Sequence, residues 1–324
     1  KLTRKICEEQ GVRLIDLYSS FRTNPKFPFF FRDEHLNSEG HELIASEITK
    51  ALTNEKGRYI AFSRFNKNER YPTFFDDGMS VLFQATDGEQ YRIISSNLIR
   101  SREDVVWTSP KELIHPIISR DGKWLAFAQG DQDNGETDII LFNRQSNEDI
   151  KVNPSDYRGA IPMFSNNSKL IAYPKWKDNE NPVIAIYDIE KGLEVMSIGD
   201  AQSEVWRPIF SPDDLKLYYI QIENDGLFGI RSYDLSTQKE KQILKLPFNI
   251  WDIAISPNCE KIVFAGNKDN NWDLFIYDIP TGKVNQLTHT LGNEWDPVFY
   301  SDSELWFAGE FGFNNGIYHI ELKE

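Results

Sequence analysis

The stretch "RPIFSPDDLKLYY", from Arg207 to Tyr219, decides the fold because the rest of the sequence keeps returning to its pattern. A proline opens an apolar segment, residues of the turn-forming types follow, and a second apolar segment ends in aromatic side chains. Turn residues between two apolar segments are typical of a β-hairpin. The stretch therefore predicts two adjacent strands with Asp213 and Asp214 in the turn between them.

This pattern occurs six times between Tyr71 and Phe307, and "HPIISRDGKWLAF" at residues 115–127 is another copy. Its turn residues are Asp121 and Gly122, and those of the next copy are Asn166 and Asn167. The marker positions that open the copies are Pro72, Pro116, Pro162, Pro208, Asp252 and Pro297. The repeat is therefore about 45 residues long, and only the fifth copy lacks the proline.

Each copy continues with a third apolar strand, such as "DLFIYDI" at 273–279, and a more polar fourth strand, such as "KVNQLT" at 283–288. Four strands in about 45 residues make one propeller blade, and neighbouring blades cover each other's faces. We therefore expect a mainly β chain with a six-bladed β-propeller at residues 57–324. The last copy has three strands, so we expect the segment at 57–65, "GRYIAFSRF", to supply its fourth strand and close the ring.

The repeat unit, best kept at residues 207–219, resembles the repeats of the TolB-type six-bladed propellers. This resemblance covers roughly residues 57–324 and implies the fold more strongly than any activity. Such propellers serve as binding scaffolds, as enzyme lids and in other roles.

The first 52 residues follow a different pattern of helix, strand, loop and helix, which predicts the end of an α/β domain. The segment "VRLIDLY" at 12–18 and the segment "FFFRDEHLNSEGHELIA" at 29–45 resemble the C-terminal part of the SGNH/GDSL hydrolases, which have a flavodoxin-like α/β fold. The resemblance implies that His35 is the general base that activates a serine and that Asp33 orients its imidazole. The spacing Asp-x-His is shorter than the Asp-x-x-His of many members, and the family's serine and oxyanion blocks would lie before Lys1.

The two resemblances leave two main candidate functions for the chain. In the first, the propeller is a binding module attached to an SGNH-type serine esterase or acyl hydrolase. In the second, the chain is a non-catalytic TolB-like propeller that binds protein or carbohydrate, and its N-terminal segment is vestigial, with Asp33 and His35 only capping a loop. A peptidase that pairs a propeller with an α/β domain is a third candidate, and it requires a hydrolase domain after the propeller. A bacterial periplasmic or extracellular location is suggested by resemblance only.

The residues just before the markers are predicted to line one mouth of the propeller channel, where six blades can converge on one ligand. Aromatic, cationic and acidic groups together suit a sugar, a peptide end or a protein loop. The candidates are Tyr71, His115, Ile161, Arg207, Trp251 and Asp296, with Trp206 and Trp295 one residue further back. The alternative is that the tryptophans pack between blades and the charges are solvated.

Composition limits the remaining function classes. The net charge of −14 over 324 residues argues against nucleic-acid binding, which needs clustered Lys and Arg. The five histidines fall on different elements, so we predict no metal site, and no cofactor is expected. Cys7 and Cys259 are too few for a disulfide framework. No stretch of 18 apolar residues occurs, so no membrane span is predicted.

Overall fold

The computed structural model describes residues 60–61, 68–76, 78–97, 103–131, 136–200, 202–290, 292–310 and 315–322. The chain divides into two compact units, Lys1–Ile60 and Ala61–Glu324, and nearly all described residues belong to the second. Their regular elements are all β-strands. Within these ranges no helix is long and apolar enough to cross a membrane. The α/β segment predicted at residues 1–52 lies outside the described residues.

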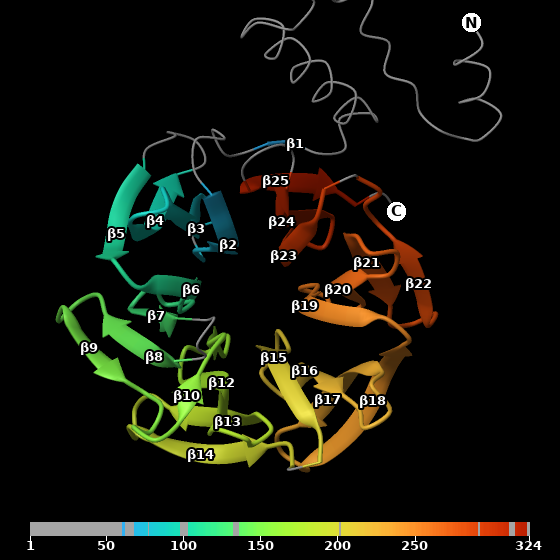
Figure 1. The fold of residues 1–324 in the computed structure, drawn as a ribbon, viewed down its shortest axis with the longest axis horizontal. Coiled ribbons are helices and arrows are strands. Elements are labelled where there is room, and N and C mark those ends of the chain that lie inside the picture. Colours follow the sequence, from blue (N-terminus) through green and yellow to red (C-terminus); the bar gives the residue numbers. More distant parts are fainter. Residues whose placement is uncertain are drawn as a thin grey trace, which may run out of the picture. The chain divides into compact units, whose positions relative to one another are not determined.

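Six antiparallel sheets surround a central axis (Figure 1), which confirms the predicted six-bladed propeller. The first blade contains β2 (Asn68–Phe74), β3 (Ser80–Thr86), β4 (Tyr91–Asn97) and β5 (Glu103–Ser109). The second contains β6 (Glu112–Ile118), β7 (Trp124–Asp131), β8 (Glu136–Asn143) and β9 (Glu148–Lys151). The third contains β10 (Arg158–Gly159), β11 (Met163–Phe164), β12 (Leu170–Trp176), β13 (Val183–Asp188) and β14 (Leu193–Ile198).

The second half of the ring repeats this order from the axis outward. The fourth blade contains β15 (Glu204–Phe210), β16 (Lys216–Ile222), β17 (Phe228–Asp234) and β18 (Lys239–Leu246). The fifth contains β19 (Asn249–Ile255), β20 (Lys261–Asn267), β21 (Trp272–Asp278) and β22 (Lys283–Gln286). The sixth contains β23 (Glu294–Ser301), β24 (Glu304–Glu310), β25 (Asn315–Glu321) and β1 (Ile60–Ala61).

Strand β1 closes the ring because it pairs with β25 at the outside of the sixth blade. Figure 1 shows β1 beside β25, between the first and the last blade. The predicted closing strand at 57–65 is therefore present, with Ile60 and Ala61 as its described part. Closure leaves no open seam between the first and last sheets.

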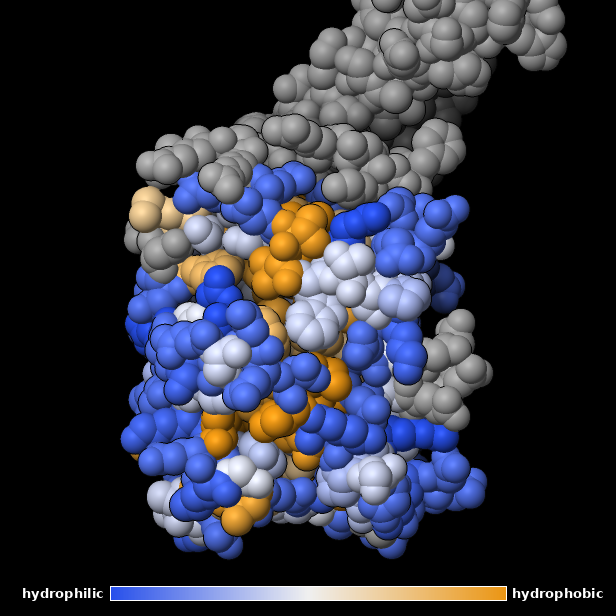
Figure 2. Space-filling view, turned by 90° about the vertical axis from the view of Figure 1, so that its left-hand side faces the viewer, coloured by the Kyte–Doolittle hydropathy of each residue, from blue (hydrophilic) through white to orange (hydrophobic). Residues whose placement is uncertain are grey.

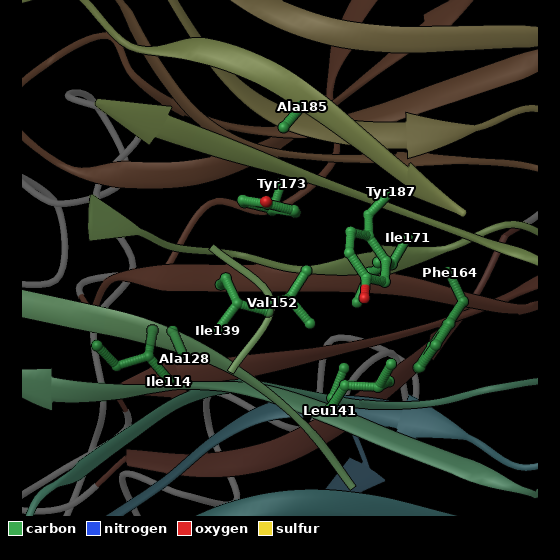
Figure 3. Close-up of a cluster of buried hydrophobic side chains, with 11 residues drawn as sticks. Ile114, Ala128, Ile139, Leu141, Val152, Phe164, Ile171, Tyr173, Ala185 and Tyr187 are labelled. Carbon is green, nitrogen blue, oxygen red and sulfur yellow. The ribbon is translucent and has the colours of Figure 1, made fainter. Parts of the chain in front are cut away.

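The core lies between the blades. Figure 3 shows one such cluster, in which Leu141 of the second blade faces Phe164, Ile171 and Tyr187 of the third. The middle strands are buried on both faces, so their sequences are runs of apolar residues rather than alternating ones. At the edge of this cluster Gly159 is required, because a Cβ atom there would come within 2.7 Å of Cγ1 of Ile139.

The outer strand of the second blade is polar and exposed. All four residues of β9 are exposed, and three of them are charged. Figure 2 views the side of the ring that lies at the left of Figure 1, where hydrophilic side chains predominate and apolar ones reach the surface in a narrow band. Charged residues on edge strands hinder pairing with other chains.

The predicted turn residues hold the hairpins and also connect blades. The hydroxyl of Ser211 donates to Asp213 and accepts from the backbone N–H of Lys216, which closes the turn of the fourth blade. The carboxylate of Asp214 reaches the turn of the third blade, where it accepts from the N–H of Asn166 at 2.7 Å and from that of Asn167 at 2.8 Å. The turn residues thus latch neighbouring blades together.

We expect Asp214→Asn to lower the stability of the propeller by about 1–2 kcal/mol, because an amide cannot accept from both N–H groups at once. Asparagine tolerates the left-handed backbone of this position (φ 57°), so the change tests only the hydrogen bonds between the two blades. Thermal unfolding should show a fall in Tm of several degrees. Asp149→Asn on the exposed strand β9 is the control. Equal Tm values for the two variants would show that the hydrogen bonds of Asp214 to the third blade do not stabilise the propeller.

Candidate functional site

Each innermost strand loses its regular pairing at the marker position. In five blades the register to the second strand shifts there, for example between Arg70 and Thr73 and between Trp206 and Ile209. In the third blade the strand is interrupted between β10 and β11. Such β-bulges re-aim side chains, and they are frequent next to functional sites.

The residue in front of each marker proline has a left-handed backbone, with φ between 48° and 57°. The five residues are Tyr71, His115, Ile161, Arg207 and Asp296. Residues other than glycine rarely adopt this conformation, which costs on the order of 1–3 kcal/mol each unless the surroundings impose it. Trp251, which precedes Asp252 instead of a proline, is not among them.

These bulged strands line a cavity of about 450 Å³ on the axis of the ring, to which all six blades contribute. Its polar part is formed by Tyr71, His115, Arg207, Asp252 and Asp296. Two residues further along, the same strands contribute a largely apolar part. That part consists of Thr73, Ile117, Met163, Ile209, Ala254 and Val298. The channel therefore combines a charged section and an apolar section.

Two buried ion pairs hold the charged section. Arg70 donates to Asp296 with Nε at 2.6 Å and Nη2 at 3.1 Å, which is a bidentate pair. Arg207 Nη1 lies 2.7 Å from Oδ1 of Asp252 and also contacts His115 Nε2. The backbone N–H of Asp296 donates to Asp252 at 3.1 Å, so the two pairs form one network. Removing one partner of a buried ion pair is strongly destabilising, because the other charge is left buried without compensation.

Burial shifts the pKa of three groups in this network. Burial and the neighbouring Asp296 raise the pKa of Asp252 to about 7, although Arg207 opposes them. Burial, Arg207 and Arg70 hold the pKa of His115 well below its usual value, so its imidazole is neutral and can accept from Arg207. Burial raises the pKa of Tyr71 to about 12. At neutral pH the section thus holds two guanidinium groups, a neutral imidazole and a neutral phenol.

The predicted aromatic residues take two kinds of position. The ring centroid of Tyr71 lies 3.9 Å from that of His115 inside the channel. Trp251 and Trp295 do not line the cavity; their rings lie against the guanidinium groups of Arg207, at 4.7 Å, and Arg70, at 4.8 Å. Trp206 packs edge to face on Trp176.

The channel therefore brings together five of the six residues predicted in front of the markers: Tyr71, His115, Ile161, Arg207 and Asp296. Two of its charged residues were not among them. Asp252 takes the channel position in the fifth blade, and the sequence signal was the Asp at the proline position of that copy. Arg70 pairs with a residue 226 positions away, for which the repeat offers no signal. Asp33 and His35 lie outside the described residues, and whether the channel residues bind a ligand stays a prediction.

The metal question depends on His115, Asp252 and Asp296, whose donor atoms all lie within 4.8 Å of one another. Imidazole and carboxylate are ligands that divalent metals accept. Arg207 Nη1 already contacts both His115 and Asp252, however, and Arg70 neutralises Asp296. The cluster therefore fits a cationic side chain better than a metal ion, which would have to displace Arg207.

Solved structures with the same architecture include TolB from Acinetobacter baumannii, which is 19% identical, with a TM-score of 0.60 over 89% of this chain and 72% of that one. The chain has the fold of the TolB propellers. An oligogalacturonate lyase in complex with manganese is 12% identical, with a TM-score of 0.59 over 84% of this chain and 95% of that one. A puromycin-hydrolyzing peptidase of Mycobacterium tuberculosis is 13% identical, with a TM-score of 0.56 over 82% of this chain and 42% of that one. No protein-family model matches the sequence, and no curated protein matches it.

At these identities the likeness establishes the fold alone, because one propeller fold serves many activities. The expected TolB-like architecture is thus confirmed. The ligand has to be argued from the channel of this chain.

A further buried acid lies outside the channel of this TolB-like propeller. Glu294, at the start of β23, is fully buried and accepts from the hydroxyl of Thr288 at 2.7 Å and from that of Thr290. Burial raises its pKa to about 8, helped by nearby Asp273 and opposed by the two hydroxyls. At neutral pH the folded protein therefore holds this carboxyl largely protonated.

Because the folded pKa of Glu294 lies above its unfolded value, the folded state binds more protons between about pH 4.5 and 8. This group therefore makes the propeller lose stability as the pH rises through that range. We expect Glu294→Gln to remove the loss and to raise Tm at pH 8 by several degrees, with a smaller difference at pH 5. Thermal unfolding across this range measures it, and a Tm difference that does not grow with pH would refute the assignment.

Proposed function

We propose that the propeller is a binding module whose ligand enters the central channel and contacts its charged section. The observation that carries the proposal is the left-handed residue repeated in front of the marker prolines, since it places Tyr71, His115, Arg207 and Asp296 on one cavity. Backbone strain of this kind clusters at ligand clamps and active sites. A protein segment or a carbohydrate is the class of ligand that we propose.

The size and composition of the channel support this proposal. A cavity of about 450 Å³ is in the range of small-ligand sites, and its wall combines apolar side chains with polar and charged ones. The network of Arg70, Asp296, Arg207 and Asp252 holds those groups in fixed positions. A site whose side chains are already ordered loses less entropy when a ligand binds.

Filling the channel tests the proposal. We expect Thr73→Phe, which adds a ring to the channel wall, to weaken ligand binding about tenfold or more because the ligand and the new ring compete for the same space. Calorimetric titration of the whole chain with a panel of neutral and acidic oligosaccharides and short peptides measures the affinity.

The matched control is Val105→Phe, a similar enlargement at an exposed position of the outer strand β5. It should bind as the unchanged protein does. A ligand that binds equally well to both variants would place the binding site elsewhere, and a panel without any ligand would remove the proposal.

We propose further that residues 1–52 are the C-terminal end of an SGNH-type ester hydrolase domain, with His35 as the base and Asp33 as its orienting group. What supports this is the run of three consecutive matching segments, at 12–18, 33–37 and 40–45. In a Ser-His-Asp site the imidazole takes the proton of the serine, and the carboxylate stabilises the imidazolium. The propeller would then hold a substrate or a partner for that domain. The competing proposal is a propeller without catalysis.

In the protein with its complete hydrolase domain, we expect His35→Ala to lower the turnover of an activated ester by several orders of magnitude, as loss of a triad base does. The rate of p-nitrophenyl acetate hydrolysis measures this, with His41→Ala as the control. The 324-residue chain by itself should hydrolyse the ester no faster than buffer. Near-normal turnover of the His35 variant would remove this residue from the mechanism.

A further inference from the structure

The neighbours of Arg207 satisfy only part of the hydrogen-bonding capacity of its guanidinium. Its Nη1 makes both contacts, to Asp252 Oδ1 and to His115 Nε2. Its Nε is buried and has no hydrogen-bond partner among the described residues, while the whole residue is only 5% exposed. A buried charged donor without an acceptor is costly and calls for an explanation.

Arg70, which pairs with the channel residue Asp296, shows what that donor can bind. It turns its Nε and Nη2 edge to the carboxylate of Asp296 and forms a bidentate pair. Two parallel N–H donors match the two oxygens of a carboxylate, which gives both strength and direction. Arg207 has the same edge, and its Nε is left without such a carboxylate.

The position of Arg207 is fixed before any ligand arrives. Asp252 and His115 hold Nη1, and the ring of Trp251 lies 4.7 Å from the guanidinium carbon. The backbone of Arg207 is itself held in the left-handed conformation in front of Pro208. A side chain held in this way loses little further freedom on binding.

The remainder of the channel indicates what accompanies the carboxylate. The apolar section is lined by Ile117, Met163, Ile209, Ala254 and Val298, together with Thr73. Such a section suits an aliphatic side chain and offers the hydroxyl groups of a sugar few partners, although Asp76, Arg120 and Asn166 also line the cavity. The C-terminal residue of a peptide combines a carboxylate with a side chain on the same carbon.

We infer that the channel binds the free C-terminus of a peptide that ends in an apolar residue. The terminal carboxylate pairs with the guanidinium of Arg207, and the terminal side chain lies in the apolar section. This inference rests on the proposed binding function of the channel and specifies its ligand. Capture of a C-terminal carboxylate is one of the recurring modes of peptide recognition, and here a side chain would supply the donors.

The experiment uses the 324-residue chain and three probes: an acetylated hexapeptide that ends in leucine with a free carboxylate, the same peptide with a C-terminal amide, and trigalacturonic acid. Calorimetry should show binding of the acid peptide and at least tenfold weaker binding of the amide, which has lost a charged acceptor. Arg207→Lys keeps the charge but not the fork, and it should also weaken the acid peptide about tenfold. Arg231→Lys is the matched control, because Arg231 also has a buried Nε without a partner but lies in β17, pairs with Glu223 and does not line the cavity; it should leave binding unchanged.

Thermal unfolding of each variant separates loss of binding from loss of folding, and the comparison of acid with amide on the unchanged protein needs no variant. Equal affinity for acid and amide would overturn the inference. Binding of trigalacturonic acid without binding of the acid peptide would overturn it too, in favour of an acidic sugar. In both cases, if the ligand that does bind is weakened by Thr73→Phe, the proposed binding function of the channel is still supported.

Discussion

A left-handed residue in front of a proline, repeated around the axis, is the constraint on which the site depends. It breaks the pairing of the innermost strand and turns one side chain of the blade into the channel. The conformation is costly by itself, and the closed ring supplies the packing that compensates for it. Fold and site are therefore coupled, because the strained positions exist only where six sheets surround an axis.

The charges in the channel show how a strongly acidic chain builds a balanced interior. The chain has a net charge of −14, yet the channel pairs two arginines with two aspartates. The ring of a tryptophan lies against the guanidinium of each arginine, which adds a cation–π attraction.

The sequence predicted the number of blades, the turns and the closing strand, because each depends on local residue types at a regular spacing. It also predicted most of the channel positions, since the residue before the marker has the same place in each copy. Asp252 escaped prediction because the fifth copy replaces the proline, and the channel position moves by one residue. The partners of Arg70 and Arg207 could not be read from the repeat, because they join blades that only the closed ring brings together.

The closing strand has a consequence for the order of folding. Strand β1 leaves the ribosome before any blade, while its partner β25 is the last strand to be made. The sheets of the first five blades consist of neighbouring segments, so each can form during synthesis. The pairing of β1 with β25 has the greatest sequence separation of the strand pairs described in the propeller, and it can form only after β25 has been synthesised. Until then the newly made protein is an open arc, and its channel is not yet a closed site.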